Sequence, residues 1–166
     1  MSSITVTSND AAALAKLQRL AQIVAKPAQA LSGSAQALRR LVQDTFRDER
    51  DPWGRAWARH APATAKARDR TSASGQILLD TGRMYGTIDA VASDAGVTVS
   101  VGTDYASYHQ FGNPSHRAWG GPVSPLPQRA FLPERAPGVV DVPAAWWYEI
   151  LFPVQAAIDN AARAGG

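Results

Sequence analysis

Hydrophobic and polar positions in the first third of the chain follow a helical period. Apolar side chains recur every three or four residues over residues 14–24 and again over 38–46, which places each set on one face of a helix. We predict a first helix that ends near Ala25, because Pro27 interrupts the pattern, and a second helix over residues 34–50. Both apolar faces are expected to pack against other helices or a sheet.

The period changes to two residues after Asp80. Alternating runs at residues 84–91 and 97–101 flank the turn sequence Ser93-Asp94-Ala95-Gly96, a combination typical of a β-hairpin. One face of this hairpin should pack on the N-terminal helices. That face is predicted to carry Met84, Gly86, Ile88, Ala90, Val97, Val99 and Val101.

The segments around the hairpin carry turn and loop signals. Asp51-Pro52-Trp53-Gly54 is a turn sequence, and Trp57 would share a helical face with Trp53 if a helix followed the turn. Residues 60–75 are basic, small and polar, and we predict a loop that is mobile or ordered by a partner. Residues 113–126 are rich in Pro and Gly, so we expect a long irregular loop there.

A C-terminal helix is predicted to start at Asp141-Val142-Pro143, with Pro near its first turn. It should kink or restart near Pro153. Its apolar residues are Trp146, Trp147, Ile150, Leu151, Val154 and Ile158.

These elements predict an α+β fold, in which N- and C-terminal helices pack on a small antiparallel sheet beside the Pro/Gly-rich loop. The length of 166 residues suits a single domain. We divide residues 1–166 into an N-terminal helical arm (1–27), a central core (28–135) and a C-terminal helix (136–166).

Composition narrows the possible functions. The chain has a net charge of +3 and scattered Lys and Arg residues, so dedicated nucleic-acid binding is a secondary interpretation. It has no Cys and only three His, which argues against disulfides, a metal centre or another cofactor. The longest apolar run, residues 144–154, is too short to span a membrane. No signal peptide is visible after Met1, so we expect synthesis in the cytoplasm.

Catalytic motifs are not evident. The sequence contains neither a Gly-x-Ser-x-Gly elbow nor a phosphate-binding Gly loop. His109 could be drawn as an acid–base pair with Asp104 or Tyr105, but a packing or hydrogen-bonding role is the more ordinary interpretation. We therefore expect no enzymatic activity.

An ordered set of short motifs covers roughly residues 34–135, although no single motif is specific. The set is Phe46, Asp51-Pro52-Trp53-Gly54-Arg55-Ala56-Trp57, Thr64, Lys66, Leu78-Leu79-Asp80-Thr81-Gly82-Arg83-Met84, Ile88, Val101-Gly102-Thr103, Tyr105-Ala106, His109-Gln110-Phe111-Gly112 and Pro127-Gln128-Arg129-Ala130-Phe131-Leu132. With this set the chain resembles the virion-morphogenesis (tail-completion) proteins of Mu-like phages. More distantly, it is similar to tail-terminator and neck proteins. Two features depart from the pattern: the loop 113–126 is longer, and the helix with Trp146 and Trp147 lies outside it.

The resemblance implies a non-enzymatic structural protein in the virion, assembled in the host cytoplasm. It implies a homo-oligomeric ring, usually of six subunits, at the head-tail junction or the head-proximal end of the tail. The neighbours would be neck, connector and tail-tube proteins, with phage DNA passing through the lumen and no membrane involved. The implied fold is again α+β.

A closed ring needs two different contact faces on each subunit. We place one at the sheet edge and the turn after it, and the other in the Pro-rich loop. The candidate interface residues are Tyr105, His109, Gln110, Phe111, Trp119, Arg129 and Phe131. Two alternatives stay open: an assembly factor or nucleic-acid-binding protein absent from the finished particle, and a hydrolase that uses His109.

Overall fold

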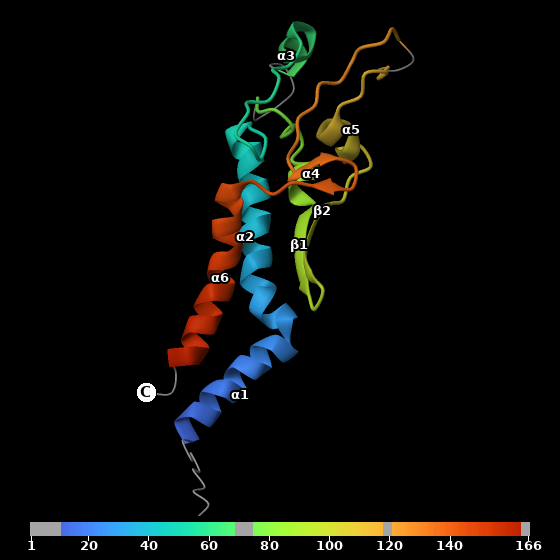
Figure 1. The fold of residues 1–166 in the computed structure, drawn as a ribbon. Coiled ribbons are helices and arrows are strands. Elements are labelled where there is room, and N and C mark those ends of the chain that lie inside the picture. The colour runs from blue at the N-terminus through green and yellow to red at the C-terminus, as the bar shows by residue number, and fades with distance from the viewer. Residues whose placement is uncertain (1–10, 69–74, 118–120, 164–166) are drawn as a thin grey trace, which may run out of the picture.

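The computed structural model of the protein describes residues 11–68, 75–117 and 121–163 (Figure 1). The helices are α1 (Ala11–Ala25), α2 (Pro27–Asp48), α3 (Pro62–Arg68), α4 (Arg83–Gly86), α5 (Ala106–Phe111) and α6 (Ala144–Arg163). The strands are β1 (Ile88–Ser93), β2 (Gly96–Val101), β3 (Glu134–Ala136) and β4 (Val139–Val140). Each strand pair is antiparallel, and the combination with flanking helices confirms the predicted α+β class.

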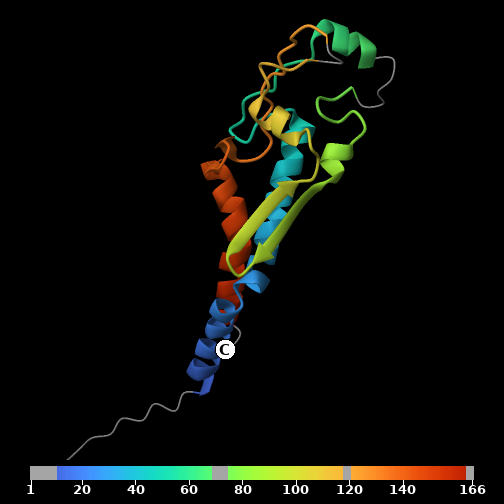
Figure 2. The same cartoon turned by 90° about the vertical axis from the view of Figure 1, so that its right-hand side faces the viewer.

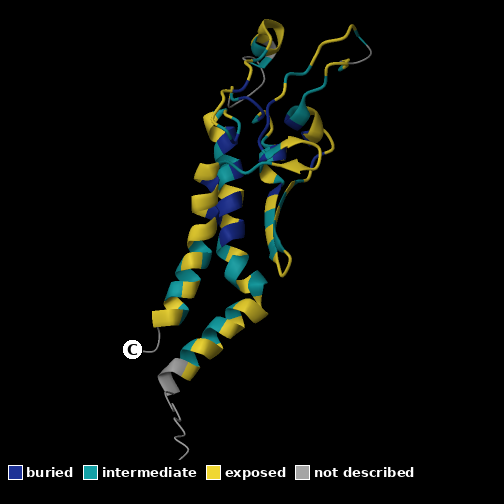
Figure 3. Ribbon diagram, in the orientation of Figure 1, coloured by how far each residue is buried: buried dark blue, intermediate teal, exposed yellow. Residues whose placement is uncertain are grey.

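Helix α2 forms the middle layer. Figures 1 and 2 show α6 running antiparallel along one side of α2 and the β1–β2 hairpin lying along another side. Helix α1 continues beyond the lower end of α2 and also contacts α6. Buried positions gather on the part of α2 that these elements cover (Figure 3). The buried residues of α2 are Ser34, Ala35, Ala37, Leu38, Val42, Thr45 and Phe46.

The predicted boundary of α1 at Ala25 is confirmed, but the predicted start of α2 is wrong. Helix α2 begins at Pro27 rather than Ser34, because proline at the first helical position needs no hydrogen-bond partner for its nitrogen and already has a helical φ. The helix ends at Asp48, where Glu49 adopts a left-handed conformation with φ of 52° and its backbone N–H bonds back to the carbonyl of Thr45.

The hairpin prediction is confirmed for its turn and its inner face. Ile88 pairs with Val101, Ala90 with Val99, and Ser93 with Gly96. The pairs Ile88–Val101, Ala90–Val99 and Ala92–Val97 lie on the face toward α2, while Asp89, Val91 and Ser93 of β1 are exposed. The prediction that the alternating run begins at Met84 is wrong. Arg83–Gly86 forms the single helical turn α4, and β1 begins at Ile88. Met84 is nevertheless buried in the same core.

The connecting segments differ from the expectations mainly at α3. No helix follows the Asp51–Gly54 turn, so Trp53 and Trp57 do not share a helical face. Part of the predicted loop 60–75 is the helix α3. The loop 113–126 contains paired positions, since its ends meet in an antiparallel bridge between Asn113 and Leu126.

Helix α6 runs continuously through Pro153, so the helix does not restart there. A Cβ on Gly33 would lie 2.6 Å from Cβ of Pro153, so glycine is required for this close approach of α2 and α6. The β3–β4 hairpin was not predicted at all.

The core is built around Phe46, which is fully buried. Its ring centroid lies 5.6 Å from that of Trp57, 5.9 Å from Tyr85 and 5.3 Å from Phe131. These partners come from three segments far apart in the sequence. The end of α2 therefore holds together the segment after the Asp51–Gly54 turn, the α4 region and the segment before β3.

Candidate functional site

The upper end of the molecule, as drawn in Figure 1, is held together by Gln110 of α5. Its Oε1 accepts hydrogen bonds from the backbone N–H groups of Phe131 (2.9 Å) and Leu132 (3.0 Å). Its Nε2 donates to the carbonyls of Leu132 (3.1 Å) and Glu134 (2.8 Å). The buried amide thus satisfies the backbone N–H and C=O groups of the segment leading into β3, as a neighbouring strand would.

A second set of contacts fixes the segment after α2. The carboxylate of Glu49 accepts bonds from Arg59 Nη1 (2.9 Å) and from the backbone N–H of Ile77 (2.7 Å). Trp57 Nε1 donates to the carbonyl of Ala130 at 2.8 Å. The Trp57 bond joins segments from before and after the β1–β2 hairpin, whereas the two Glu49 bonds join segments that precede it.

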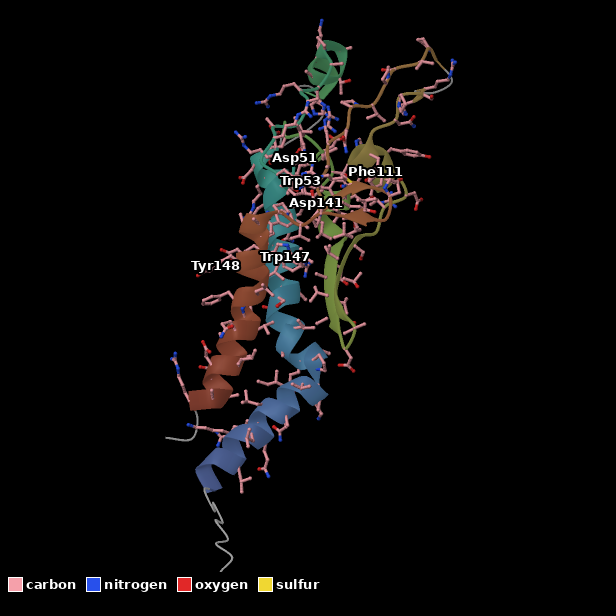
Figure 4. The ribbon with its side chains drawn as sticks, in the orientation of Figure 1. Asp51, Trp53, Phe111, Asp141, Trp147 and Tyr148 are labelled. Carbon is pink, nitrogen blue, oxygen red and sulfur yellow. The ribbon has the colours of Figure 1, made fainter. Side chains whose placement is uncertain are left out.

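The adjoining turn is tied to the β3–β4 hairpin. Asp51 Oδ1 accepts the backbone N–H of Trp53 at 3.0 Å, and the guanidinium of Arg135 lies 4.1 Å from the ring centroid of Trp53. Arg135 also forms an ion pair with Asp141. Figure 4 shows Asp51, Trp53 and Asp141 gathered where this turn meets the start of α6.

A pocket of about 680 Å³ opens among α3, α4, α5 and the segment 116–129. It brings together all three histidines of the chain with four arginines: His60, His109, His116, Arg59, Arg68, Arg83 and Arg129. Asp80 is the acidic residue in its lining. We call this cluster the basic pocket.

The buried arginine of the basic pocket has no carboxylate partner among the described residues. Arg129 donates from Nε to the carbonyl of Ala58 (2.9 Å) and from Nη2 to that of Arg59 (3.3 Å). These neutral carbonyls accept two hydrogen bonds but carry no charge to balance the guanidinium, and the nearby carboxylate of Glu49 forms its ion pair with Arg59 instead. The pocket therefore carries a net positive field.

That field acts on the histidines. Burial, followed by the positive charge of Arg129, lowers the pKa of His109 to about 4. Burial, followed by the charge of Arg68, also lowers the pKa of His60. Nδ1 of His109 and Nε2 of His60 are buried and have no hydrogen-bond partner among the described residues. Both rings are neutral at pH 7.

We expect acidification to destabilise the protein through His109. The unfolded chain takes up this proton near pH 6.5, but the folded chain does so only near pH 4. Stability contributed by the neutral ring is therefore complete above pH 6.5 and is lost as the pH falls toward 4. The full shift corresponds to roughly 3 kcal/mol, which partial solvent exposure reduces to roughly 1–2 kcal/mol.

Urea unfolding at pH 7 and pH 4.5 tests this expectation. The variant His109→Gln should lose distinctly less stability between the two pH values than the wild type, because it lacks the titrating ring. Equal losses in both proteins would contradict the prediction. An unchanged slope of unfolding free energy against urea concentration would show that unfolding exposes the same amount of surface in both proteins.

Helix α6 presents a different kind of surface. Trp146 and Ile150 are buried against the rest of the chain. The next two stripes around the helix, Trp147 with Leu151 and Tyr148 with Phe152, are each about half exposed or more, with Tyr148 at 71%. Figure 4 shows Tyr148 on the side of α6 turned away from α2. We call Tyr148 and Phe152 the outer aromatic pair; their ring centroids are 6.3 Å apart.

An apolar groove of about 500 Å³ lies between α6 and β2. Leu31 and Leu38 of α2, Val97 and Val99 of β2, and Trp147 of α6 contribute to its walls. We call this feature the α6–β2 groove. Hydrophobic surface of this extent is unusual for a chain that works alone.

The seven predicted interface residues fall into three groups. Tyr105, His109 and Phe111 remain at least partly accessible, whereas Gln110, Arg129 and Phe131 are buried in the single chain. Trp119 lies outside the described residues. Tyr105, His109 and Arg129 converge on the basic pocket, and Gln110 positions Phe131 through its backbone N–H. Their role at a subunit interface stays a prediction.

Sequence reasoning missed Arg59, His60 and Arg83 as parts of one site. A signal was present, because residues 52–68 and 105–133 contain no Asp or Glu. The exposed aromatic stripes of α6 were also recognisable, since the stretch Trp146–Phe152 is apolar on nearly every side of a helix.

Other site types find little support in the described part of the chain. No group of three or more potential metal ligands occurs among these residues. None of the described helices combines the length and hydrophobicity that a membrane span requires.

Comparison with known proteins gives one clear result. Curated proteins and solved structures yielded no match. A sequence model of the phage virion morphogenesis family matches residues 8–141, which include α2, both hairpins and the basic pocket. This match confirms the resemblance seen in the ordered motifs. The chain therefore belongs to the phage virion morphogenesis family, and its role is in the structure or assembly of a phage particle.

Proposed function

We propose that the protein is a non-enzymatic structural subunit that forms a closed homo-oligomeric ring, of six copies, at the head-tail junction or the head-proximal end of the tail. There it would join the tail to the head and contact neck, connector and tail-tube proteins. Membership of the family supports a role in the particle. The ring itself is supported by the surface of α6.

The observation that carries the proposal is the mismatch between the sequence of α6 and its burial. A helix that is apolar on most of its circumference is normally enclosed by other elements. In the single chain only the Trp146 stripe is buried, while Trp147, Tyr148, Leu151 and Phe152 remain exposed. A further partner is needed to remove these side chains from water.

A second copy of the chain can supply that partner. The outer aromatic pair is exposed on α6, whereas the α6–β2 groove is concave and apolar. These are two different faces of one subunit, so insertion of the pair into the groove of the next subunit gives a heterologous contact. Repetition of such a contact closes into a ring when the rotation between subunits permits it.

The variant Tyr148→Gln/Phe152→Gln should prevent ring formation. Glutamine keeps a high helix propensity, and both positions are exposed, so the monomer should retain its fold. Native mass spectrometry and sedimentation velocity should show rings for the wild type and monomers for the variant. Thermal unfolding of the monomeric variant should remain cooperative.

Asn160→Ala is the matched control, because Asn160 is an exposed polar residue of the same helix. It should form rings like the wild type. Rings in the double variant, or a wild type that stays monomeric at high concentration, would contradict the proposal.

Purified virions test the location. Mass spectrometry should find the protein in the particle, and imaging of labelled particles should place it at the junction of head and tail. A protein required for assembly but absent from finished virions would instead be the assembly factor considered from the sequence. Loss of a hydrolytic turnover in His109→Ala would overturn the non-enzymatic assignment.

A further inference from the structure

The basic pocket is the centre of a larger charged surface. Helix α3 forms one arm, and residues 113–117 with 121–126 form another, at the same end of the molecule (Figures 1 and 2). The pocket is lined by Thr64 and Arg68 from one arm and by His116 and Leu126 from the other. Both arms belong to the acid-free stretches of the sequence.

Several cations on this surface are available to an external anion. Arg83 is exposed on the pocket lining and has no acidic partner among the described residues. Lys66 and Arg117 are exposed on the two arms. Among the described residues, Arg117 donates to the carbonyl of Gly121 at 3.3 Å and has no acidic partner. Positive groups therefore extend from the pocket along both arms.

The interior of the pocket also lacks hydrogen-bond partners. Nδ1 of His109 and Nε2 of His60 are buried without one in the described part of the chain. The imidazole of a neutral histidine can donate one hydrogen bond, and unmet polar atoms at a pocket wall are costly unless a ligand or water satisfies them. An oxyanion in the pocket would balance the positive charge of its arginines.

We propose that the basic pocket and the two arms bind the phosphate backbone of double-stranded DNA without reading its sequence. Cations extend beyond the pocket, where Asp80 is the acidic residue of the lining and pairs with Arg68. Such a spread of positive charge favours a long polyanion over a single carboxylate group. Lys66 on one arm, Arg117 on the other and Arg83 on the pocket lining match repeated phosphates better than they match one ligand in a closed cavity. This inference rests on the proposed function only in that the ring would bring DNA to this surface. DNA binding and ring formation are therefore measured separately.

Fluorescence anisotropy with a short labelled duplex of arbitrary sequence tests the proposal on the full-length protein. The wild type should bind, and its affinity should fall steeply between about 50 and 200 mM salt. Arg83→Gln/Arg117→Gln should weaken binding roughly tenfold and reduce the slope of log affinity against log salt by about 2. A duplex of unrelated sequence should give the same values.

Arg39→Gln/Arg163→Gln is the matched control. It removes the same number of charges from exposed positions of α2 and α6, and it should change the affinity by less than about twofold if binding is localised. Sedimentation velocity on the same samples reports the oligomeric state, so a loss of rings is distinguished from a loss of DNA binding. Lys66→Gln, on the surface of α3, provides an independent variant should the first one unfold.

Three outcomes would overturn the proposal. One is no binding of the duplex by the folded wild type. Another is equal weakening by the test and control variants, which would reflect net charge alone. The third is displacement of bound duplex at a lower concentration of poly-glutamate than of unlabelled duplex, which would identify an acidic protein segment as the preferred ligand.

Discussion

Replacing Phe46 by alanine is expected to lower the free energy of unfolding by about 3–5 kcal/mol. Phe46 is fully buried and its ring contacts Trp57, Tyr85 and Phe131. Truncation removes the transfer energy of the ring and leaves a cavity that its aromatic neighbours cannot fill without leaving their own positions. The three connecting segments lose their common anchor at the same time.

Urea unfolding followed by tryptophan fluorescence measures this loss, because Trp57 lies beside the cavity. The control is Val91→Ala, an exposed apolar position on β1, which should cost less than about 1 kcal/mol. A cost of Phe46→Ala as small as that of the control would mean that the ring cluster does not organise the core. The comparison should be made at one protein concentration, since oligomer formation adds to apparent stability.

Replacing Gln110 by leucine is expected to cost roughly 2–4 kcal/mol. Leucine has a similar volume but makes none of the four hydrogen bonds that the amide forms with the segment 131–134. Each buried N–H or C=O left without a partner costs about 1–3 kcal/mol, and the losses are not additive because they share one side chain. The chain before β3 should therefore detach locally from α5.

Native-state hydrogen exchange separates this effect from a general loss of stability. The N–H groups of Phe131 and Leu132 should lose protection far more than those in the middle of α2. Gln155→Leu is the control, since Gln155 is exposed and bonds only to Asp159 on its own helix; it should change stability by less than about 0.5 kcal/mol. Uniform loss of protection in Gln110→Leu would contradict a local role.

The local pattern of the chain predicted the elements whose signal lies within a few residues. The hairpin turn at Ser93–Gly96 and the inward face with Ile88 and Val99 follow from alternation and a turn sequence alone. The end of α1 follows from the proline two residues beyond Ala25. Errors occurred at Met84 and at the start of α2, where a short apolar run or a proline is compatible with more than one local conformation.

The candidate site depended on long-range contacts. Glutamine at position 110 is equally compatible with a surface role, and only the packing of α5 against residues 131–134 makes it a buried partner of the backbone. The three histidines are dispersed in the sequence and were interpreted as unrelated. Folding brings them to one pocket because Arg129 links the segment of residues 58–59 to the chain after α5.

By itself, the sequence determined the α+β class, the family and the helical and strand periods, because these depend on composition, local order and motif spacing. Only the tertiary structure decided which apolar and charged groups remain uncovered. Whether an apolar side chain is buried depends on which elements pack against it. Helix α6 is apolar on several sides, but its buried residues are Trp146 and Ile150, on the side toward α2. The exposed aromatic face and the basic pocket are consequences of that packing.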